Sequence, residues 1–212
     1  MYLPKHFDPP DAQAVRTLID ATPLATLVVM TAQGLDANLI PMEFAPDEGP
    51  HGTLRGHVAR ANPLWREALP EHEALAVFQG PQAYISPNWY PTKREHGKVV
   101  PTWNYMVVQA RGTLRAVDDP TWLRALVGRL TDRHESRSAV PWRVSDAPAD
   151  YIAQMLGAIV GIEIRLSELN AKWKLSQNRS SADRLGVAAG LMSQPGDEAR
   201  EMAELIKPPA GG

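Results

Sequence analysis

The sequence of 212 residues contains no cysteine, so it can form neither a disulfide bond nor a metal site built on thiolates. It also contains no run that approaches the roughly 18 apolar residues that a membrane-spanning helix requires. Residues 1–7 lack the apolar core of a signal peptide. These absences favour a cytoplasmic protein that does not span a membrane. A composition with 44% hydrophobic and 22% charged residues is typical of a globular chain.

The chain also lacks an excess of positive charge. Its net charge is −2, whereas a DNA-binding domain usually carries a surplus of lysine and arginine. The densest basic cluster consists of Lys172, Lys174, Arg179 and Arg184, and a solvated surface explains such a cluster more often than nucleic acid does. The sequence contains no helix-turn-helix signature and no basic arm.

Motifs for metal, nucleotide and acyl-transfer chemistry are missing as well. The six histidines form neither an H-x-H nor an H-E-x-x-H pair. The glycines of residues 49–56 match neither the G-x-G-x-x-G spacing nor that of a P-loop. No G-x-S-x-G nucleophile elbow occurs. The sequence therefore gives no reason to expect a zinc site, a dinucleotide fold or a serine hydrolase.

The hydrophobic pattern predicts a mainly β protein with antiparallel pairing. Strands are expected at residues 24–30, 35–44, 53–58, 75–78, 106–116 and 160–166. A turn at Gln33 and Gly34 joins the first two runs as a hairpin. Six to seven short strands with few helices between neighbours favour closure of the sheet into a barrel.

Helices are expected near both ends of the chain and after the fifth strand. Residues 8–11 have the aspartates and prolines of a helix start, and Val15, Leu18 and Ile19 then share one face. Further helices are expected at residues 64–68, from residue 118 onwards, at residues 151–159 and from Ser180 onwards. Residues 202–206 indicate one last turn or two, and residues 208–212 are expected to fray.

Aromatic and short polar side chains alternate in residues 84–90 and 99–105. The stretch contains Tyr84, Trp89, Tyr90, Trp103 and Tyr105 beside Ser86, Asn88, Thr102 and Asn104. Aromatic rings offer stacking surface, and short polar side chains can hydrogen-bond the rim of a flat polar ligand. The stretch is therefore a candidate pocket wall. Alternatively, the aromatic side chains simply fill the core of a barrel.

A second candidate site lies where the third strand ends and a short helix begins. Arg55, His57, Arg60 and Asn62 are close together in this segment. Arginine can grip a phosphate with two hydrogen bonds, and the backbone N–H groups of the turn add donors. Alternatively, these are ordinary surface residues at the end of a strand.

A third candidate is the run KWKLSQNR at residues 172–179. Ser176, Gln177 and Asn178 offer both donors and acceptors, which the edge of a heterocycle such as an isoalloxazine would require. Alternatively, the run is a polar turn that precedes a helix cap at Ser180.

Five segments in order resemble the PaiB-type transcriptional regulators, which are FMN-binding split-barrel proteins. They are MYLPKHF (1–7), GHVARANP (56–63), YISPNWY (84–90), VPTWNY (100–105) and KLSQNR (174–179). The resemblance implies a mainly β protein with flanking helices, built as an antiparallel six-stranded split β-barrel that forms a homodimer. It implies an FMN-binding split-barrel domain with its flanking helices at residues 1–170. Residues 171–212 would then pack on the barrel or on the partner subunit.

FMN is the cofactor that the resemblance implies. In the wider superfamily of pyridoxamine-phosphate oxidases and flavin reductases, FMN lies in a groove between two subunits. By analogy, its phosphate would meet Asn38 and Ile40 and the turn from His57 to Asn62, with Arg55 and Arg60 as cations. Asn38 stands where the oxidases have arginine. The flavin ring is expected to stack on Tyr84 or Trp103 and to form hydrogen bonds with Asn104, Ser176, Gln177 and Asn178. Lys174 is a further residue expected to bind the cofactor.

The resemblance implies a negative transcriptional regulator or a flavin sensor that binds without turnover. DNA is implied as a partner by the resemblance alone. One alternative is an FMN-dependent oxidoreductase that resembles pyridoxamine-phosphate oxidase or flavin reductase. A second alternative is a haem-binding split barrel with His57 or His134 as the iron ligand.

Overall fold

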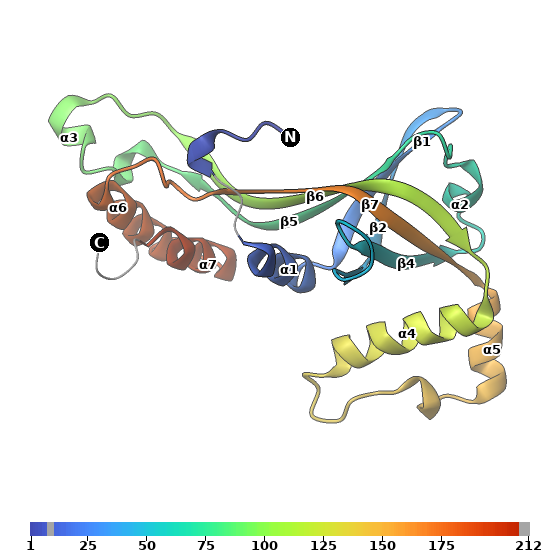
Figure 1. Cartoon of the computed structure of the whole chain (residues 1–212). Coiled ribbons are helices and arrows are strands. Elements are labelled where there is room, and N and C mark those ends of the chain that lie inside the picture. Colours follow the sequence, from blue (N-terminus) through green and yellow to red (C-terminus); the bar gives the residue numbers. More distant parts are fainter. Residues whose placement is uncertain (8–10, 208–212) are drawn as a thin grey trace. The chain divides into compact units, whose positions relative to one another are not determined.

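The computed structural model describes residues 1–7 and 11–207 of the chain (Figure 1). The strands are β1 (Leu24–Thr31), β2 (Gly34–Pro41), β3 (Glu43–Ala45), β4 (Thr53–Ala59), β5 (Ala74–Ile85), β6 (Thr102–Val117) and β7 (Ile159–Lys174). The α-helices are α1 (Ala12–Ala21), α2 (Leu64–Glu67), α3 (Lys93–His96), α4 (Pro120–Glu135), α5 (Ala149–Gly157), α6 (Ser181–Met192) and α7 (Asp197–Ile206). Short 3-10 turns occur at η1 (Lys5–Phe7), η2 (Pro87–Trp89) and η3 (Val144–Asp146).

The chain divides into two compact units. Unit 1 comprises Met1–Leu18, Gln79–Val108 and Asn170–Gly212, and unit 2 comprises Ile19–Phe78 and Gln109–Leu169. Strands β5, β6 and β7 each contribute one end to each unit. In the described part of the chain, no helix has the length and apolar character that a membrane crossing requires.

The strands form a sheet in the order β2-β1-β5-β6-β7-β4-β3. The predicted antiparallel pairing is confirmed for the strand pairs β1–β2, β1–β5, β3–β4 and β4–β7. Strand β5 extends beyond the predicted residues 75–78 to a length of 12 residues. Gly80 and Pro81 interrupt the apolar pattern, so sequence periodicity alone ends this strand too early. Strands β6 and β7 are likewise longer than predicted, at 16 residues each.

The sheet has seven strands rather than the six that the family resemblance implies, because the expected strand at residues 35–44 is divided at Met42. Strand β2 pairs with β1, whereas β3 pairs with β4. The N–H of Met42 donates to the carbonyl of Pro23 at 2.8 Å. Since β2 and β3 are opposite edges of one sheet yet only one residue separates them, the sheet must curl until its edges approach. The expected closure of the sheet into a barrel is therefore wrong for the hydrogen-bonded ladder, which stays open because β2 and β3 are not neighbours in it.

Unit 2 has its core between the curled strands and α4. Leu27, Leu54 and Ile162 are fully buried strand residues, and α4 contributes the buried Leu126. The Arg129 guanidinium of α4 donates two hydrogen bonds of 2.8 Å to the carboxylate of Glu43 in β3. Helix α5 lies beside α4 (Figure 1).

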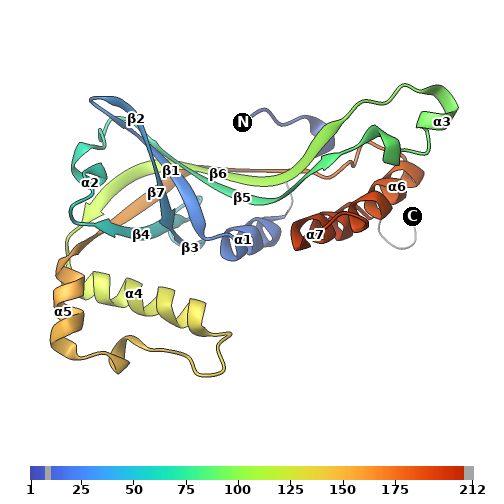
Figure 2. The same cartoon turned by 180° about the vertical axis from the view of Figure 1, so that it is seen from behind.

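Unit 1 contains the helix pair α6–α7, which lie side by side in both views (Figures 1 and 2). The predicted start of α6 is confirmed, because the Ser180 side chain accepts a hydrogen bond from the Asp183 N–H at 3.2 Å. Helix α7 has ten residues, which is more than the one or two turns expected. Gly196, with φ of 99°, adopts the left-handed backbone region that favours glycine and lets the chain turn before α7.

The predicted start of the first helix is confirmed at Asp11, whose side chain accepts from the Ala14 N–H at 2.7 Å. The predicted helical face is confirmed too, since Val15, Leu18 and Ile19 are all buried. Residues 8–10 of the expected helix start and the expected tail at 208–212 lie outside the described residues.

Two glycines of α6 create room for aromatic packing. Gly186 and Gly190 lie four residues apart and therefore share one face of the helix. A methyl group at Gly190 would overlap the ring of Trp89, and one at Gly186 would overlap the backbone of Trp89. The absence of both side chains lets η2 pack directly on α6.

We expect Gly190→Ala to destabilise the protein by about 1–3 kcal/mol, because an added methyl in a packed contact forces the ring away. The matched control is Gly128→Ala in α4, where a methyl group would meet nothing within 4 Å. This control should raise stability by about 0.5–1 kcal/mol, since alanine loses less entropy than glycine in a helix. Chemical denaturation followed by circular dichroism measures both effects. Equal effects of the two changes would contradict the packing described for Trp89.

Candidate functional site

A small polar pocket in unit 1 brings together four of the residues predicted to hold a ligand. Asn104 lies in β6, Lys174 at the end of β7, and Ser176 and Asn178 in the turn that follows. The pocket has a volume of about 110 Å³, and its other lining residues are Phe7, Tyr90, Val100, Pro101, Thr102 and Arg179. The amide nitrogen of Asn104 donates to the Ser176 hydroxyl at 2.9 Å, which connects the strand to the turn.

Two polar groups of this pocket are buried and lack a partner. Asn104 is 1% exposed and Tyr90 is 2% exposed. Within residues 1–7 and 11–207, neither the Asn104 side-chain oxygen nor the Tyr90 hydroxyl has a hydrogen-bond partner. Burial raises the pKa of Tyr90, although the nearby Arg179 acts in the opposite direction, and the protonated hydroxyl can donate. An unsatisfied buried polar group costs about 1–3 kcal/mol, so these two atoms indicate a place for a polar ligand.

Two cations border the same pocket. The Lys174 ammonium donates to the Thr102 hydroxyl at 2.5 Å. Burial lowers the pKa of Lys174, and the nearby positive charges of Lys172 and Arg179 act in the same direction. The Arg179 guanidinium lies 4.9 Å from the ring centroid of Tyr90. A desolvated positive charge of this kind favours an anionic partner.

Gln177, a further predicted ligand of the ring, does not line this pocket. Its side-chain oxygen accepts from the Leu175 N–H at 2.7 Å, and its side-chain nitrogen donates to the Trp173 carbonyl. These bonds hold the turn in which Ser176 adopts a φ of 61°. In this structure Gln177 therefore stabilises the local backbone. Arg179, which the sequence analysis assigns to a basic surface cluster, does line the pocket. Its position directly after Ser176, Gln177 and Asn178 is the sequence signal that could have identified it as a site residue.

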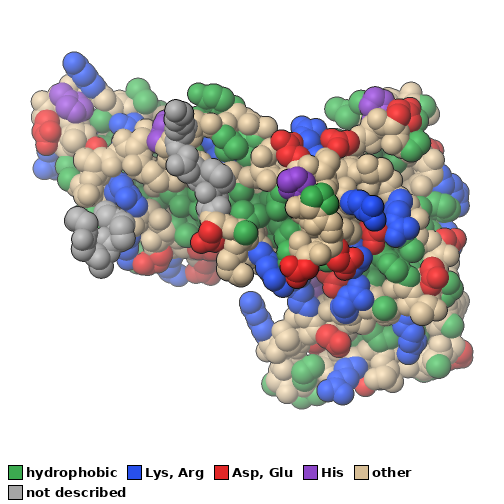
Figure 3. Space-filling view, in the orientation of Figure 1, with side chains coloured by type: hydrophobic (Ala, Val, Ile, Leu, Met, Phe, Trp, Pro, Cys, Tyr) green, Lys and Arg blue, Asp and Glu red, His purple; other side chains and the backbone are tan. Residues whose placement is uncertain are grey.

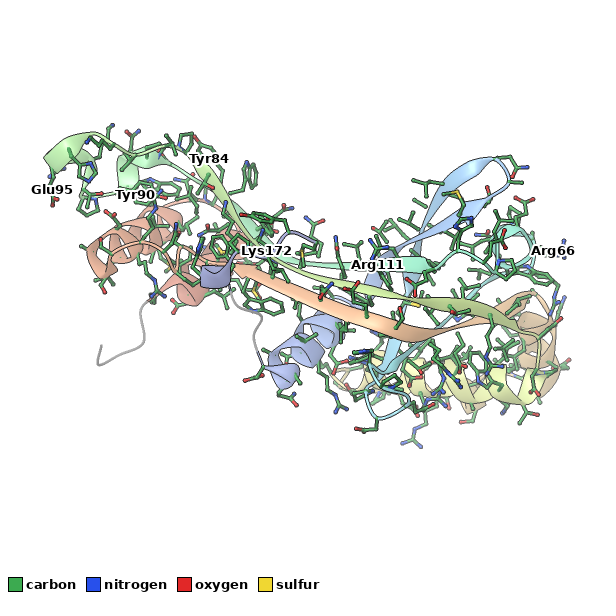
Figure 4. All side chains as sticks on the ribbon, turned by 45° about the horizontal axis from the view of Figure 1, so that its top comes forward. Arg66, Tyr84, Tyr90, Glu95, Arg111 and Lys172 are labelled. Carbon is green, nitrogen blue, oxygen red and sulfur yellow. The ribbon has the colours of Figure 1, made fainter. Side chains whose placement is uncertain are left out.

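The predicted aromatic wall is present at the surface of unit 1. Tyr84 of β5 and Trp103 of β6 are 47% and 53% exposed, and their ring centroids lie 6.0 Å apart in an edge-to-face arrangement. They line a second pocket of about 610 Å³ together with Ser86, Asn88, Trp89 and residues at the junction of α6 and α7, which include Asp197 and Glu198. Figure 4 labels Tyr84 and the buried Tyr90. Tyr90 is buried in unit 1, whereas Tyr84 and Trp103 are open to solvent, so only these last two rings offer a surface on which a ligand can stack.

Arg60, predicted to bind phosphate, is fully engaged within unit 2. Its guanidinium donates to both carboxylate oxygens of Asp118 at 2.8 and 2.6 Å. It also donates to the carbonyls of Gly157 at 2.7 Å and Ile159 at 3.0 Å. Arg60 therefore connects the turn after β4 to the residue that follows β6, to the end of α5 and to the start of β7.

Arg55 is engaged in a similar way. It donates to Glu163 at 2.9 Å and to Glu48 at 2.8 Å, and Glu163 also accepts from Arg115 at 2.8 Å. Burial alone would raise the pKa of Glu163, but the hydrogen bonds from Arg55 and Arg115 outweigh it and hold the pKa below its ordinary value. A phosphate would have to compete with these carboxylates for Arg55.

The other predicted residues of unit 2 lie close together but bind one another. The Asn62 amide donates to the side-chain oxygen of Asn38 at 2.9 Å, and its own oxygen accepts from the Leu64 N–H at the start of α2. Ile40 is 3% exposed and belongs to the core. Asn38 and Asn62 thus join β2 to the turn after β4.

His57 and His134 line a common pocket of unit 2. Its volume is about 330 Å³, and Val127, Leu130 and Trp142 form its apolar wall. The Nδ1 atom of His57 is buried and has no partner in the described part of the chain. Burial lowers the pKa of His57, so its imidazole is neutral at pH 7. No group of three or more metal-ligating side chains occurs among the described residues.

The structure thus defines a mainly β protein with flanking helices, an exposed aromatic wall and a polar pocket lined by two cations. Residues 1–168 match the family described as "Putative FMN-binding domain", and the chain belongs to this family. The chain is 33% identical over 208 residues to the protein "Protease synthase and sporulation protein PAI 2" of Bacillus subtilis (strain 168). This alignment covers 98% of the chain and 97% of that protein. The PaiB-type resemblance and the assignment of FMN as the cofactor are thereby confirmed.

Solved structures with a similar fold include a protein from Mycobacterium smegmatis that binds FAD and haem. It matches with a TM-score of 0.59 and 18% identity, over 85% of this chain and 78% of that one. The flavocytochrome Anf3 from Azotobacter vinelandii matches with a TM-score of 0.52 and 17% identity, over 77% of this chain and 67% of that one. At these identities the similarity concerns the fold alone.

Proposed function

We propose that this protein is an FMN-binding regulator or flavin sensor that acts as a homodimer, with its curled sheet serving as a split barrel. The observation that carries the proposal is membership of the FMN-binding family over residues 1–168. The relative of PaiB type supports a regulatory rather than a catalytic output. Bound FMN would supply a redox-active, visibly absorbing ring.

The Tyr84–Trp103 wall suits the flat ring of FMN. Ligand pockets usually have volumes of about 300–1,000 Å³, and the pocket that these residues line falls within that range at about 610 Å³. Ser86 and Asn88 offer hydrogen bonds at its rim. The polar pocket at Lys174 is much smaller, so we assign ring stacking to Tyr84 and Trp103.

A homodimer is supported by the outer face of the β1–β2 hairpin. Leu24, Leu35 and Leu39 are 55%, 74% and 66% exposed. Residues that pair across the two strands share a face, and on this face the pairs are Leu24–Pro41, Thr26–Leu39, Val28–Ala37 and Met30–Leu35. Figure 3 shows hydrophobic side chains at the surface where Figure 1 places this hairpin.

A second copy of the chain is the occupant that suits this face best. All but one of its eight positions are apolar and none is charged, so two copies can meet without placing like charges together. An exposed apolar edge strand invites pairing or aggregation, and covering it removes that risk. We therefore assign this face to the dimer interface.

Haem binding is a second candidate function, favoured by one observation. His57 and His134 line the same apolar pocket, and the buried Nδ1 of His57 has no partner among the described residues. Neutral imidazole is a common axial ligand of haem iron.

We expect the protein to bind FMN, and Trp103→Ala to weaken that binding by about 0.5–1.5 kcal/mol, which corresponds to roughly a two- to tenfold rise in Kd. The reason is the loss of stacking surface. Quenching of flavin fluorescence measures the affinity. The control is Tyr151→Ala, which removes an exposed ring of α5 in unit 2. A protein that stays colourless after incubation with FMN and desalting would exclude the proposed function.

The same preparation distinguishes a sensor from an oxidoreductase. A sensor should hold flavin that NADH and NADPH reduce only slowly, as absorbance under anaerobic conditions reports. Rapid, repeated turnover would instead favour the FMN-dependent oxidoreductase.

We expect Leu39→Asp to convert the dimer to a monomer, because a charge on each copy would be buried at the interface without a partner. Size-exclusion chromatography with light scattering reports the mass. Val140→Asp is the matched control, since Val140 is 85% exposed and lies outside the hairpin. A monomeric wild-type protein, or an unchanged mass of the Leu39 variant, would refute the assigned interface.

If haem binds beside His57, titration with haem should produce a Soret band that His57→Ala shifts or abolishes through loss of the iron ligand. His51→Ala, which alters an exposed histidine of the β3–β4 loop, should leave the band unchanged. The absence of any Soret shift in the wild-type protein would remove this second function.

A further inference from the structure

We propose that the polar pocket of unit 1, formed by Tyr90, Asn104, Lys174, Ser176 and Arg179, is a binding site for a small oxyanion such as phosphate. The site is separate from the Tyr84–Trp103 wall, with which it shares no lining residue. Its volume of about 110 Å³ suits an ion rather than a heterocycle.

The two cations of the pocket have no acidic partner in its lining. Lys174 and Arg179 both line it, and no aspartate or glutamate does. In the part of the chain that the structure describes, neither cation forms a salt bridge. The nearby Asp183 instead accepts hydrogen bonds from the N–H and the hydroxyl of Thr92. Two partly buried positive charges that no carboxylate pairs with are stabilised when an anion enters.

The uncharged groups complete the set of donors. Tyr90, a residue 98% buried, lines the pocket, and its hydroxyl has no acceptor among the described residues, so it can donate to an oxyanion. Asn104 and Ser176 can exchange roles, because the serine hydroxyl can donate to the amide oxygen as well as accept from the amide nitrogen. In that arrangement the buried amide N–H₂ of Asn104 is left to donate to the ligand.

The backbone holds Ser176 in place. Its φ of 61° is a left-handed conformation that a non-glycine residue adopts at a cost of about 1 kcal/mol or more. The side chain of Gln177 stabilises this turn through Trp173 and Leu175. A turn fixed in this way keeps the donors preorganised, which reduces the entropy lost when a ligand binds.

Two sources can supply the oxyanion: free phosphate, or the phosphate group of FMN. Assignment of the site to the phosphate of FMN rests on the proposed function. Isothermal titration calorimetry with inorganic phosphate, at constant ionic strength, tests the site directly. We expect wild-type protein to bind phosphate, Lys174→Met to weaken binding at least tenfold, and Tyr90→Phe to weaken it severalfold. Lys98→Met, which removes an exposed lysine outside the pocket, should have no effect.

Tyr90→Phe keeps the proposal testable if the Lys174 variant fails to fold. It deletes only a hydroxyl group, so the unfolding temperature of the protein without ligand should stay the same or rise.

A competition experiment identifies the source of the oxyanion. Phosphate that weakens binding of FMN but not of riboflavin assigns the site to the cofactor, whereas simultaneous binding assigns it to a free anion. Wild-type protein that does not bind phosphate, or a Lys174→Met variant that binds it equally well, would overturn the site. Neither result depends on whether FMN itself binds.

Discussion

The single residue between the two edges of the sheet, Met42, is the constraint on which the arrangement of unit 2 depends. Strands β2 and β3 pair with different neighbours, so the sheet can satisfy both ladders only by curling. Gly56 of β4 permits the close approach, since a Cβ there would lie 2.9 Å from the Pro41 carbonyl. The curl in turn leaves one face of the β1–β2 hairpin apolar and exposed, which is the face that a second copy can cover.

The cationic side chains of the two candidate sites differ in whether the protein itself supplies acceptors for them, and residue type alone does not predict this difference. Arg55 and Arg60 are bound by carboxylates and carbonyls of their own unit, where they fasten strands to loops. Lys174 and Arg179 have no carboxylate beside them in the pocket that they line. An arginine that already donates to protein acceptors gains little from a ligand, whereas an uncompensated cation gains a full charge-assisted bond. Ligand binding therefore depends on which donors the fold leaves unused.

The same logic applies to the aromatic residues. Tyr84 and Trp103 present open rings at the surface, while Tyr90, six residues after Tyr84, is enclosed. Family membership assigns FMN to the chain, and the open rings are the surface on which its flat ring can stack. The enclosed tyrosine contributes only its hydroxyl, which suits a small ion better than a ring.

Local patterns in the sequence determined most of the secondary structure and the composition of the candidate site. Apolar periodicity predicted the strands, Ser180 predicted the start of α6, and five short motifs identified the family. Each of these signals lies within a few neighbouring residues, so it can be read from the sequence alone. Only the tertiary structure decided which of the candidate side chains form hydrogen bonds within the protein and which are left to bind a ligand. Arg60 meets Asp118 from 58 residues away, and Arg55 meets Glu163 from 108 residues away. No local pattern encodes such partners, since they come together only when distant strands pair.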